Sequence, residues 1–317
     1  MARFLVTGGA GFIGSALVHR LLGLGHTLRV VDDFSTGFRC NLEPCLARLE
    51  LVEGDVAELA VCRAAAQGVE YVLHQAAIPS VPRSIEDPLA SNRVNVTGTL
   101  NMLLAAREAG VKRFVFASSS SVYGESEVLP KVETMPEDPL SPYALTKLAG
   151  EKYGLVFQRI YNLSTVSLRY FNVFGPRQNP HSQYSAVISR FVDAALEGRR
   201  PTVYGDGEQS RDFTYVDNVV EANLLACFAE RASGMVFNVG TGQTRTLNDL
   251  LRSLASIVGR PVEAEYTSAR LGDVRHSQAS IEKARRILGF EPQVSFEQGL
   301  ERTVDWLRRA RAKRAEK

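Results

Sequence analysis

The sequence of 317 residues has few cysteines and no long apolar run. The four cysteines, Cys40, Cys45, Cys62 and Cys227, form neither the close pairs of a metal site nor a disulfide framework. No apolar run reaches the ~18 residues that a membrane-spanning helix needs. The chain also enters a glycine-rich strand at once, without the charged and apolar regions of a secretion signal. We therefore expect a cytoplasmic protein without a membrane segment and without a metal.

An excess of charge of one sign is also missing. Lysine and arginine together number 37 against 35 acidic residues, and much of the basic excess lies in the last ten positions. No basic stripe with interleaved aromatic residues occurs, which argues against a nucleic-acid partner. Hydrophobic residues at 45% and charged residues at 23% are typical of a folded globular protein. The length fits one large α/β unit or two closely packed domains.

Short apolar runs alternate with segments that have helical periodicity, as expected for parallel βαβ units. The expected strands are 4–7, 28–32, 49–53, 71–74, 114–118 and 164–169, and the expected crossover helices include 13–24, 97–109 and 142–160. Beyond residue 175 the chain has more Pro/Gly loops, with helices expected near 185–196, 247–257 and 280–288. The pattern predicts an α/β fold: a Rossmann-type doubly wound parallel sheet in residues 1–175, and a smaller α/β substrate lobe mainly in 176–317. We also expect a later crossing of the chain between the two.

A glycine motif follows the first expected strand and opens the first helix. Gly9, Gly11 and Gly14 fit G-x-G-x-x-G, in which the turn lets a pyrophosphate approach the backbone and the helix N-terminus. Asp32 ends the next strand, where an acid accepts hydrogen bonds from an adenosine ribose and repels a ribose phosphate. The motif therefore predicts NAD rather than NADP. The alternative is a merely structural turn with Asp32 as a helix cap. Asp55 is either a border of the adenine or an ordinary loop residue.

Two further patterns indicate acid/base chemistry. Tyr143 and Lys147 stand at i and i+4 and share a face if the segment is helical, for which Ser141-Pro142 is a plausible start. A nearby positive charge favours the phenolate form of a tyrosine. Residues 118–121 form a serine run at the end of an apolar strand. Alone, a Tyr/Lys pair at this spacing usually consists of exposed residues without a functional role, and a serine run is usually a loop. Together with the glycine turn, the two patterns predict an active site.

At this point the chain resembles the extended short-chain dehydrogenases/reductases that epimerise or dehydrate nucleotide sugars. The resemblance rests on residues 7–14 (TGGAGFIG), 74–77 (HQAA), 95–99 (NVTGT), 122–124 (VYG) and 169–176 (RYFNVFGP), together with Ser119, Tyr143 and Lys147. It implies that Ser119 is the catalytic hydroxyl, that Tyr143 is the acid/base, and that Lys147 binds the nicotinamide ribose and lowers the pKa of the phenol. Ser118, Ser120 and Ser121 are supporting candidates. The serine run lacks the Thr-Asp-Glu of the similar 4,6-dehydratases, so dehydration is disfavoured.

The resemblance also implies the residues around each ligand. Around NAD it implies Gly8, Gly11, Phe12, Ile13, Asp32, Asp33, Ser35, Thr36, Gly37, Asp55, Val56, Gln75, Ala76, Ala77, Asn95, Tyr143, Lys147 and Tyr170. Around a UDP-sugar it implies Ser80, Ser119, Ser120, Tyr143, Asn172, Gln178, Ala186, Val187, Thr202, Tyr204, Arg211, Arg270, Asp273 and Ser277. Two arginines suit a diphosphate.

Position 277 bears on the sugar. Ser277 matches a position that is bulky in strict UDP-galactose 4-epimerases, and a small residue leaves room for an N-acetyl group. The resemblance therefore implies a 4-epimerase of UDP-N-acetylglucosamine and UDP-N-acetylgalactosamine that also accepts UDP-glucose and UDP-galactose, through a 4-keto intermediate. Ser277 is alternatively a packed surface serine. Phe213, where some relatives have tyrosine, and Pro79, where the plain-hexose epimerases have lysine, depart from the pattern.

Other functions stay open. A UDP-glucuronate decarboxylase or 4-epimerase would need a basic group facing C6 of the sugar. A catalytically silent protein of the same fold that senses NAD or a nucleotide is a third possibility, against which the intact Ser119, Tyr143 and Lys147 argue. The resemblance further implies a homodimer in which helices 97–109 and 142–160 form a four-helix bundle, although their outer apolar positions equally fit a core.

Overall fold

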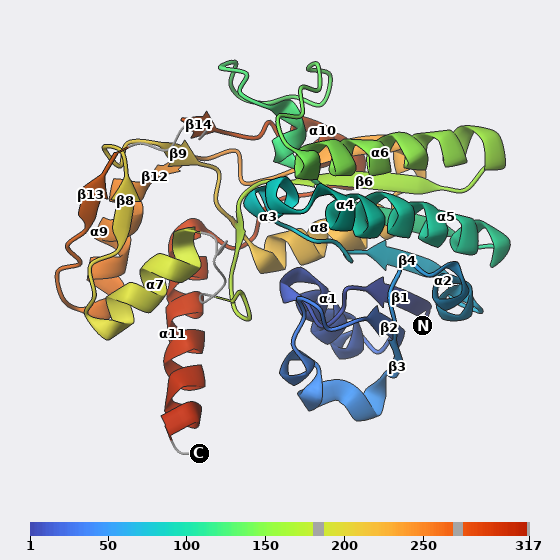
Figure 1. Cartoon of the computed structure of the whole chain (residues 1–317), viewed down its shortest axis with the longest axis horizontal. Coiled ribbons are helices and arrows are strands. Elements are labelled where there is room, and N and C mark those ends of the chain that lie inside the picture. The colour runs from blue at the N-terminus through green and yellow to red at the C-terminus, as the bar shows by residue number, and fades with distance from the viewer. Residues whose placement is uncertain (180–186, 269–274, 316–317) are drawn as a thin grey trace.

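The structure is a computed structural model that describes residues 1–179, 187–268 and 275–315. Its centre is a seven-stranded parallel sheet with the strand order β11-β6-β5-β4-β1-β2-β3 (Figure 1). The strands are β1 (Arg3–Thr7), β2 (Thr27–Asp32), β3 (Glu50–Glu53), β4 (Tyr71–His74), β5 (Arg113–Ser119), β6 (Thr165–Tyr170) and β11 (Met235–Val239). The six strands expected from the sequence are all present, and the Rossmann-type fold is confirmed.

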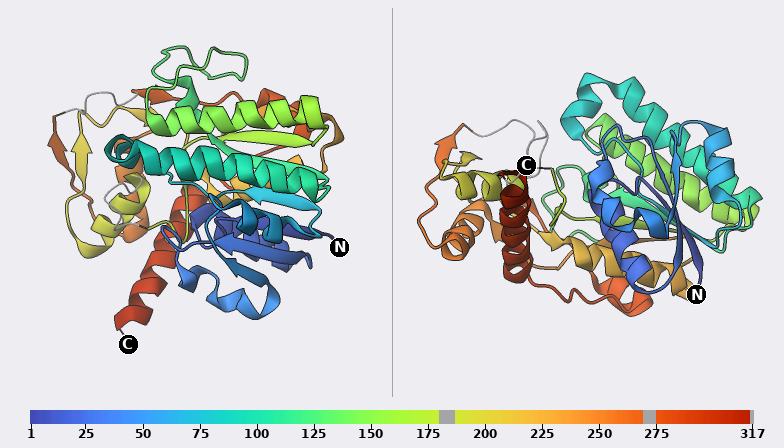
Figure 2. Two further views of the ribbon diagram at one scale, coloured as in Figure 1. Left: turned by 45° about the vertical axis from the view of Figure 1, so that its right-hand side comes forward. Right: turned by 90° about the horizontal axis from the view of Figure 1, so that it is seen from below.

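Helices cover both faces of this sheet, as two views show (Figure 2). One face carries α1 (Phe12–Gly23) and α8 (Val216–Phe228), and the other carries α2 (Leu59–Ala66), α5 (Gly98–Glu108) and α6 (Pro142–Tyr161). Burial on both faces explains why the strands are continuous apolar runs rather than alternating ones. In β1, for example, Phe4, Leu5 and Val6 are all fully buried.

The chain beyond residue 175 is shared between the sheet and a smaller lobe. Strand β11 pairs with β6 at the edge of the large sheet, α8 packs beside α1, and α10 (Glu282–Leu288) packs against β11. The strand β11 was not among the expected strands. The chain thus leaves the sheet after β6, returns to it with α8 and β11, leaves again, and returns with α10.

The smaller lobe is α/β and lies beyond one end of the sheet (Figure 1). Its helices are α7 (Val187–Glu197), α9 (Leu247–Val258) and α11 (Phe296–Ala315). Its short strands are β8 (Thr202–Tyr204), β9 (Ser210–Arg211), β12 (Arg245–Thr246), β13 (Glu265–Thr267) and β14 (His276–Ser277), while β7 (Val173–Phe174) pairs with β10 (Thr214–Tyr215).

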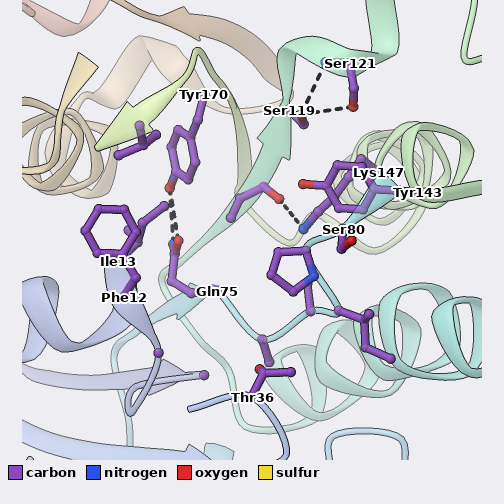
Figure 3. A pocket seen from close by; sticks show the side chains of 18 of the residues that line it. Phe12, Ile13, Thr36, Gln75, Ser80, Ser119, Ser121, Tyr143, Lys147 and Tyr170 are labelled. Atoms are coloured by element: carbon purple, nitrogen blue, oxygen red, sulfur yellow. Dashed lines mark hydrogen bonds between the residues drawn. The ribbon is translucent and has the colours of Figure 1, made fainter. Parts of the chain in front are cut away.

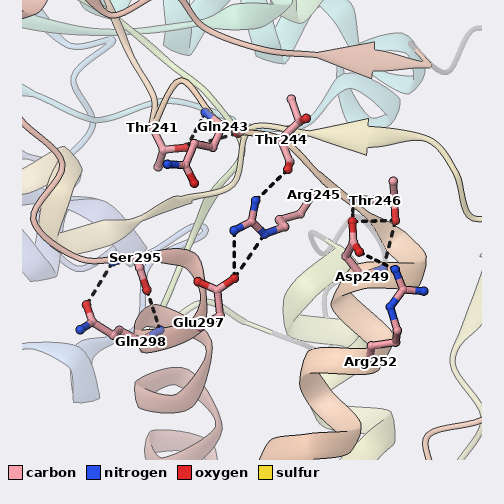
Figure 4. A network of polar contacts seen from close by, with 10 residues as sticks. All are labelled: Thr241, Gln243, Thr244, Arg245, Thr246, Asp249, Arg252, Ser295, Glu297 and Gln298. Carbon is pink, nitrogen blue, oxygen red and sulfur yellow. Dashed lines mark hydrogen bonds and ion pairs between the residues drawn. The ribbon is translucent and has the colours of Figure 1, made fainter.

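Local hydrogen bonds fix where the helices of this lobe begin (Figure 4). Thr246 and Asp249 form a reciprocal capping box at the start of α9, which satisfies backbone N–H groups that the helix leaves free. Arg245, in the adjacent strand β12, forms an ion pair with Glu297 in the first turn of α11 at 3.1 Å. These contacts link β12, α9 and α11, and β12 in turn pairs with β9.

Within the described part of the chain, no helix combines the length and the apolar content that crossing a bilayer requires.

Candidate active site

A single cavity of about 1040 Å³ joins the two lobes at the carboxyl ends of the parallel strands. Its wall runs from the glycine turn after β1, past the ends of β2, β4, β5 and β6, to Arg211 and Ser277 in the small lobe. In open α/β sheets ligands bind in this place. The volume lies at the upper end of the range for one drug-sized ligand, and Figure 3 shows the side chains that face the cavity.

The glycine turn makes one end of the cavity. Gly8 has a φ of +65°, which a residue with a side chain adopts only with strain. A methyl group on Gly14 would lie 2.0 Å from the carbonyl oxygen of Gly8, so only glycine lets α1 start this close to β1. Helix α1 has no side-chain cap at Gly11 and no acidic residue in its first turn. Its free N–H groups are therefore available to an anion in the cavity.

Asp32 lies at the end of β2 beside this turn. Its two carboxylate oxygens accept hydrogen bonds from the backbone N–H groups of Ala10, at 2.8 Å, and Phe34, at 2.9 Å. Burial raises the pKa of Asp32, although these two backbone hydrogen bonds act in the opposite direction. A carboxylate oxygen can accept more than one hydrogen bond, so each retains a lone pair for a ribose hydroxyl.

All but one of the predicted cofactor residues line the cavity. The exception is Asn95, whose side chain is buried behind the wall. Its amide accepts a hydrogen bond from the backbone N–H of Ile78 at 2.8 Å and donates to the hydroxyl of Thr146 at 3.0 Å. It thereby holds the segment after β4 against α6, and its role at the cofactor stays a prediction.

The predicted catalytic hydroxyls meet at the end of β5. The Oγ of Ser119 accepts a hydrogen bond from the backbone N–H of Ser121 and lies 2.9 Å from its Oγ. Helix α6 begins at Pro142 with Ser141 as its cap, as expected, and this brings Tyr143 to Ser119. Burial raises the pKa of the Tyr143 phenol, and a hydrogen bond with Ser119 partly opposes that rise.

Lys147 lies one turn further along α6. Its Nζ donates a hydrogen bond to the carbonyl oxygen of Ala117 at 2.8 Å and is 5.9 Å from the centre of the Tyr143 ring. Burial lowers the pKa of Lys147 to about 8. In the protein without NAD, burial is the larger influence on the pKa of Tyr143, and the lowering of that pKa by Lys147 stays a prediction. The ammonium group nevertheless faces the same cavity (Figure 3).

Ser118, a supporting candidate, has a different role. Its hydroxyl donates a hydrogen bond to Glu151 on α6, and Glu151 also receives two hydrogen bonds from Arg169 on β6, at 2.9 and 2.8 Å. Both charged side chains are almost fully buried. This ion pair fixes α6 against β5 and β6, and thereby sets where Tyr143 and Lys147 lie.

A buried carboxylate organises the opposite end of the cavity. Asp212 accepts hydrogen bonds from the backbone N–H groups of Thr241, Gly242 and Ala279, and from the Thr241 hydroxyl. Its own N–H donates to the carbonyl of Ser277 at 2.8 Å. Strands β9 and β14 are held side by side in this way, with Arg211 opposite Ser277, and both residues line the cavity.

The predicted substrate residues fall into three groups. Those on the cavity wall are Ser80, Ser119, Ser120, Tyr143, Asn172, Gln178, Arg211 and Ser277. Val187, at the start of α7, and Thr202 and Tyr204, in β8, are not on that wall, and their contact with a substrate stays a prediction. Ala186, Arg270 and Asp273 lie outside the described residues.

Three basic residues on the cavity wall lie outside the predicted set of site residues, namely Arg83, Lys131 and Arg177. None of them belongs to a motif with a known chemical meaning in the sequence alone. For Arg177 the available signal was its position directly after a Gly-Pro turn at the end of a strand. In the described chain no group of three or more histidine, cysteine or acidic side chains could hold a metal ion.

Comparison with known proteins identifies the family. Residues 4–240 match the sequence model of the NAD dependent epimerase/dehydratase family. The chain belongs to this family. The resemblance inferred from the motifs is thereby confirmed, and so is NAD as the cofactor.

The relatives are similar over nearly their whole length. A UDP-glucose 4-epimerase of Mycolicibacterium smegmatis is 41% identical, with 96% of this chain and 98% of that protein covered. The UDP-N-acetylglucosamine 4-epimerase of Methanobrevibacter ruminantium M1, solved with UDP-N-acetylmuramic acid, is 38% identical with a TM-score of 0.93, covering 98% and 99% of the two chains. The UDP-glucose 4-epimerase of Thermotoga maritima, solved with UDP-glucose, is 40% identical with a TM-score of 0.92, covering 97% and 99%.

The cavity fits the cofactor of this family. The nearest atom to a methyl group placed on Gly11 would be the Gly8 oxygen at 3.2 Å, so the turn leaves its cavity side open for a pyrophosphate. Asp32 stands where the adenosine ribose is bound in this fold, and Lys147 and Tyr143 stand at the other end of the same wall. The donors and acceptors required at both ends of a dinucleotide are therefore present.

Proposed function

We propose that the protein is a 4-epimerase that interconverts UDP-N-acetylglucosamine with UDP-N-acetylgalactosamine, and also UDP-glucose with UDP-galactose. One observation carries this proposal. Ser119, Tyr143 and Lys147 share a single cavity with the glycine turn and Asp32 on one side and Arg211 and Ser277 on the other. A reacting sugar held by its diphosphate at Arg211 would present its ring to the tyrosine.

The proposed roles follow from the geometry. Tyr143 takes the proton of the C4 hydroxyl, through or beside Ser119, and Ser119 is held for this by Ser121. Bound NAD would supply the hydride acceptor for C4 and the hydride donor for the return step, so that the sugar would pass through a 4-ketone with no net consumption of cofactor. Lys147 holds the ribose next to the nicotinamide and adds positive charge near the phenol. Epimerisation requires the 4-ketone to turn over before the hydride returns, and Tyr143 then gives its proton back.

The breadth of substrate is tied to Ser277. Its side chain is small, it lines the cavity next to Arg211 on the neighbouring strand, and its strand is held by Asp212. In the proposed binding mode, a hydroxymethyl group here would leave room for an acetamido group at C2 of the sugar. This is the feature that distinguishes the proposed dual substrate range from a strict UDP-galactose 4-epimerase.

The primary test is the identity of the products. The purified protein is incubated with each of the four UDP-hexoses, and the products are identified by NMR. Interconversion within both pairs is expected, and Tyr143→Phe should lower kcat by a factor of about 100 or more, as for loss of a general acid/base. Near-normal turnover by the variant would refute the assignment. NAD binding without turnover of any substrate would instead indicate a silent nucleotide-sensing protein.

The role of Ser277 has its own test. Ser277→Tyr should abolish turnover of the acetylated pair and retain that of the plain pair, whereas the control Ser277→Ala should retain both. Equal effects of Ser277→Tyr on both pairs would contradict the proposed gate.

A second candidate substrate is UDP-glucuronate, and Lys131 favours it. Its side chain is almost fully buried on the cavity wall, burial lowers its pKa, and its Nζ donates to the carbonyl of Ser126. Among the described residues no carboxylate pairs with it. An acidic C6 substituent would supply that partner. Turnover of UDP-glucuronate that is lost in Lys131→Met would support this candidate, and no turnover by the unaltered protein would exclude it.

We also propose that the protein forms a homodimer through α6 and α5. Leu145, Val156 and Ile160 lie on the outer side of α6 with exposed fractions of 57%, 42% and 67%. An apolar stripe at helical spacing is expected to be covered by another helix. Ile160→Asp should shift the protein to a monomer in light scattering after gel filtration, while Arg309→Asp, at an exposed position on α11, should not. A dimer that persists in Ile160→Asp would argue against this interface.

A further inference from the structure

The loop after β7 holds an arginine in an unusual backbone conformation. Arg177 has a φ of +69°, a left-handed value that is uncommon for any residue with a side chain. The loop is closed by two hydrogen bonds of Gln178, from its backbone N–H to the Gly175 carbonyl at 3.4 Å and from its side chain to the Val173 carbonyl at 3.1 Å. Such strained positions persist where the surroundings hold them, and they are frequent at functional sites.

This conformation directs Arg177 back to α1, which lies far away in the sequence. The Nε of Arg177 donates a hydrogen bond to the Oγ of Ser15 at 3.1 Å. Ser15 is fully buried in the first turn of α1, and its hydroxyl in turn donates to the carbonyl of Phe12 at 3.0 Å. Arg177 and Phe12 both line the cavity. The guanidinium group therefore lies beside the helix N-terminus at which the cofactor diphosphate binds in a Rossmann fold.

Positive charge predominates around this position. Burial lowers the pKa of Arg177, and among the residues described no carboxylate lies within ion-pair distance of it. Asp217 acts on it only as a more distant charge. The first turn of α1 has no acidic residue. A partly buried cation without a counter-ion is unfavourable, and here it lies next to the positive end of a helix dipole.

We propose that Arg177 is a cofactor-binding residue whose guanidinium, oriented by Ser15, pairs with the diphosphate of NAD beside the α1 N-terminus. A diphosphate supplies the two negative charges that this corner lacks. With Nε used by Ser15, the two Nη groups remain to donate to phosphate oxygens. The loop 175–178 would thereby be fastened over the bound cofactor by the same residue that contacts it. This inference uses the NAD dependence of the family and does not depend on the sugar that the enzyme turns over.

The test separates a phosphate contact from a structural one. Arg177→Gln, Arg177→Lys and Ser15→Ala are compared with Arg20→Gln, a control on α1 whose side chain is exposed and lies 3.9 Å from Glu221. Each full-length protein is freed of NAD and then titrated with NAD, and ADP and adenosine are competed against NAD. Arg177→Gln should weaken NAD and ADP by about 10- to 100-fold, the size expected for lost charge-assisted hydrogen bonds. Adenosine should be affected less than twofold.

The other variants make the result specific. Arg177→Lys should bind NAD more tightly than Arg177→Gln but less tightly than the unaltered protein. Ser15→Ala should weaken NAD binding several-fold, and combining it with Arg177→Gln should weaken binding little further. Arg20→Gln should leave the affinity for NAD unchanged. An equal loss for ADP and adenosine would show that Arg177 only supports the loop, and unchanged NAD affinity would refute the contact. Because saturating NAD should restore turnover in Arg177→Gln, failure of this inference is distinguishable from failure of the proposed epimerase activity.

Discussion

The buried ring of His74 should make the free energy of unfolding decrease as the pH falls below 7. The residue ends β4, is almost fully buried and lies between two threonines. The Thr99 hydroxyl donates to the Asn95 carbonyl, so it accepts from Nε2–H of His74 at 3.1 Å. The Thr7 hydroxyl accepts the N–H of Ala76 and donates to Nδ1 of His74 at 2.8 Å. Both ring nitrogens are therefore satisfied in the neutral form.

Protonation of this ring is costly in the folded protein. Burial, and to a smaller extent the charge of Lys147, lowers the pKa of His74 from 6.5 to about 3. The unfolded chain then binds more protons than the folded one between these two values, so stability falls as the pH falls through that window. From pH 7 to pH 5 the loss is about 2 kcal/mol for this one residue. The free energy of unfolding in urea, measured at several pH values, gives the slope.

The control is the difference between variants. His74→Gln removes the titrating group and should reduce the pH dependence between 7 and 5 by about 2 kcal/mol, whatever its own stability at pH 7. If His74→Gln and the unaltered protein lose the same free energy over this range, the neutral buried ring is not the cause.

Three further predictions concern the site and its support. Gly14→Ala forces a methyl group against the Gly8 carbonyl. The purified variant should therefore contain little bound NAD, as measured by absorbance, and its free energy of unfolding should fall by about 1–3 kcal/mol; full NAD content would contradict this. Asp32→Asn should weaken NAD binding by about tenfold or more and reduce the ratio of the affinities for NAD and NADP, as measured by titration with both cofactors. An unchanged ratio would show that Asp32 does not contact the ribose. Glu151→Gln removes the buried carboxylate that pairs with Arg169 and leaves only the partly exposed Glu137, at 3.1 Å, as its counter-ion. It should cost about 2–3 kcal/mol in urea unfolding, and a cost below ~1 kcal/mol would show that the pair does not hold α6.

The first half of the fold was predictable because its strands, apart from the edge strand β3, are apolar runs that the protein buries, and because each crossover is a local unit. Strand β11 was not, because Met235–Val239 follows a stretch in which the chain has already left the sheet. Helix α8 was missed for a related reason: it is buried on most sides, so it lacks the clear apolar stripe of a surface helix. Long-range pairing of this kind has no local signal.

The candidate site also has a part that local sequence predicts and a part that it does not. Gly14, Tyr143 and Lys147 belong to motifs with a local backbone geometry, and the structure places all three on the cavity wall. Asn95 is buried behind that wall, and only the fold reveals that its amide contacts Ile78 and Thr146. Arg177 was overlooked since its meaning depends on Ser15, which no sequence spacing connects to it.

The position of β11 has a consequence for how the chain acquires its structure during synthesis. Until residue 239 has left the ribosome, β6 is an exposed strand edge, and all six of its residues are ones that the finished protein buries. Unpaired apolar edges of this kind attract other unfinished chains. The nascent protein must therefore carry an incomplete cofactor domain while most of the substrate end is still being made, and a fragment that stops at residue 175 should aggregate rather than bind NAD.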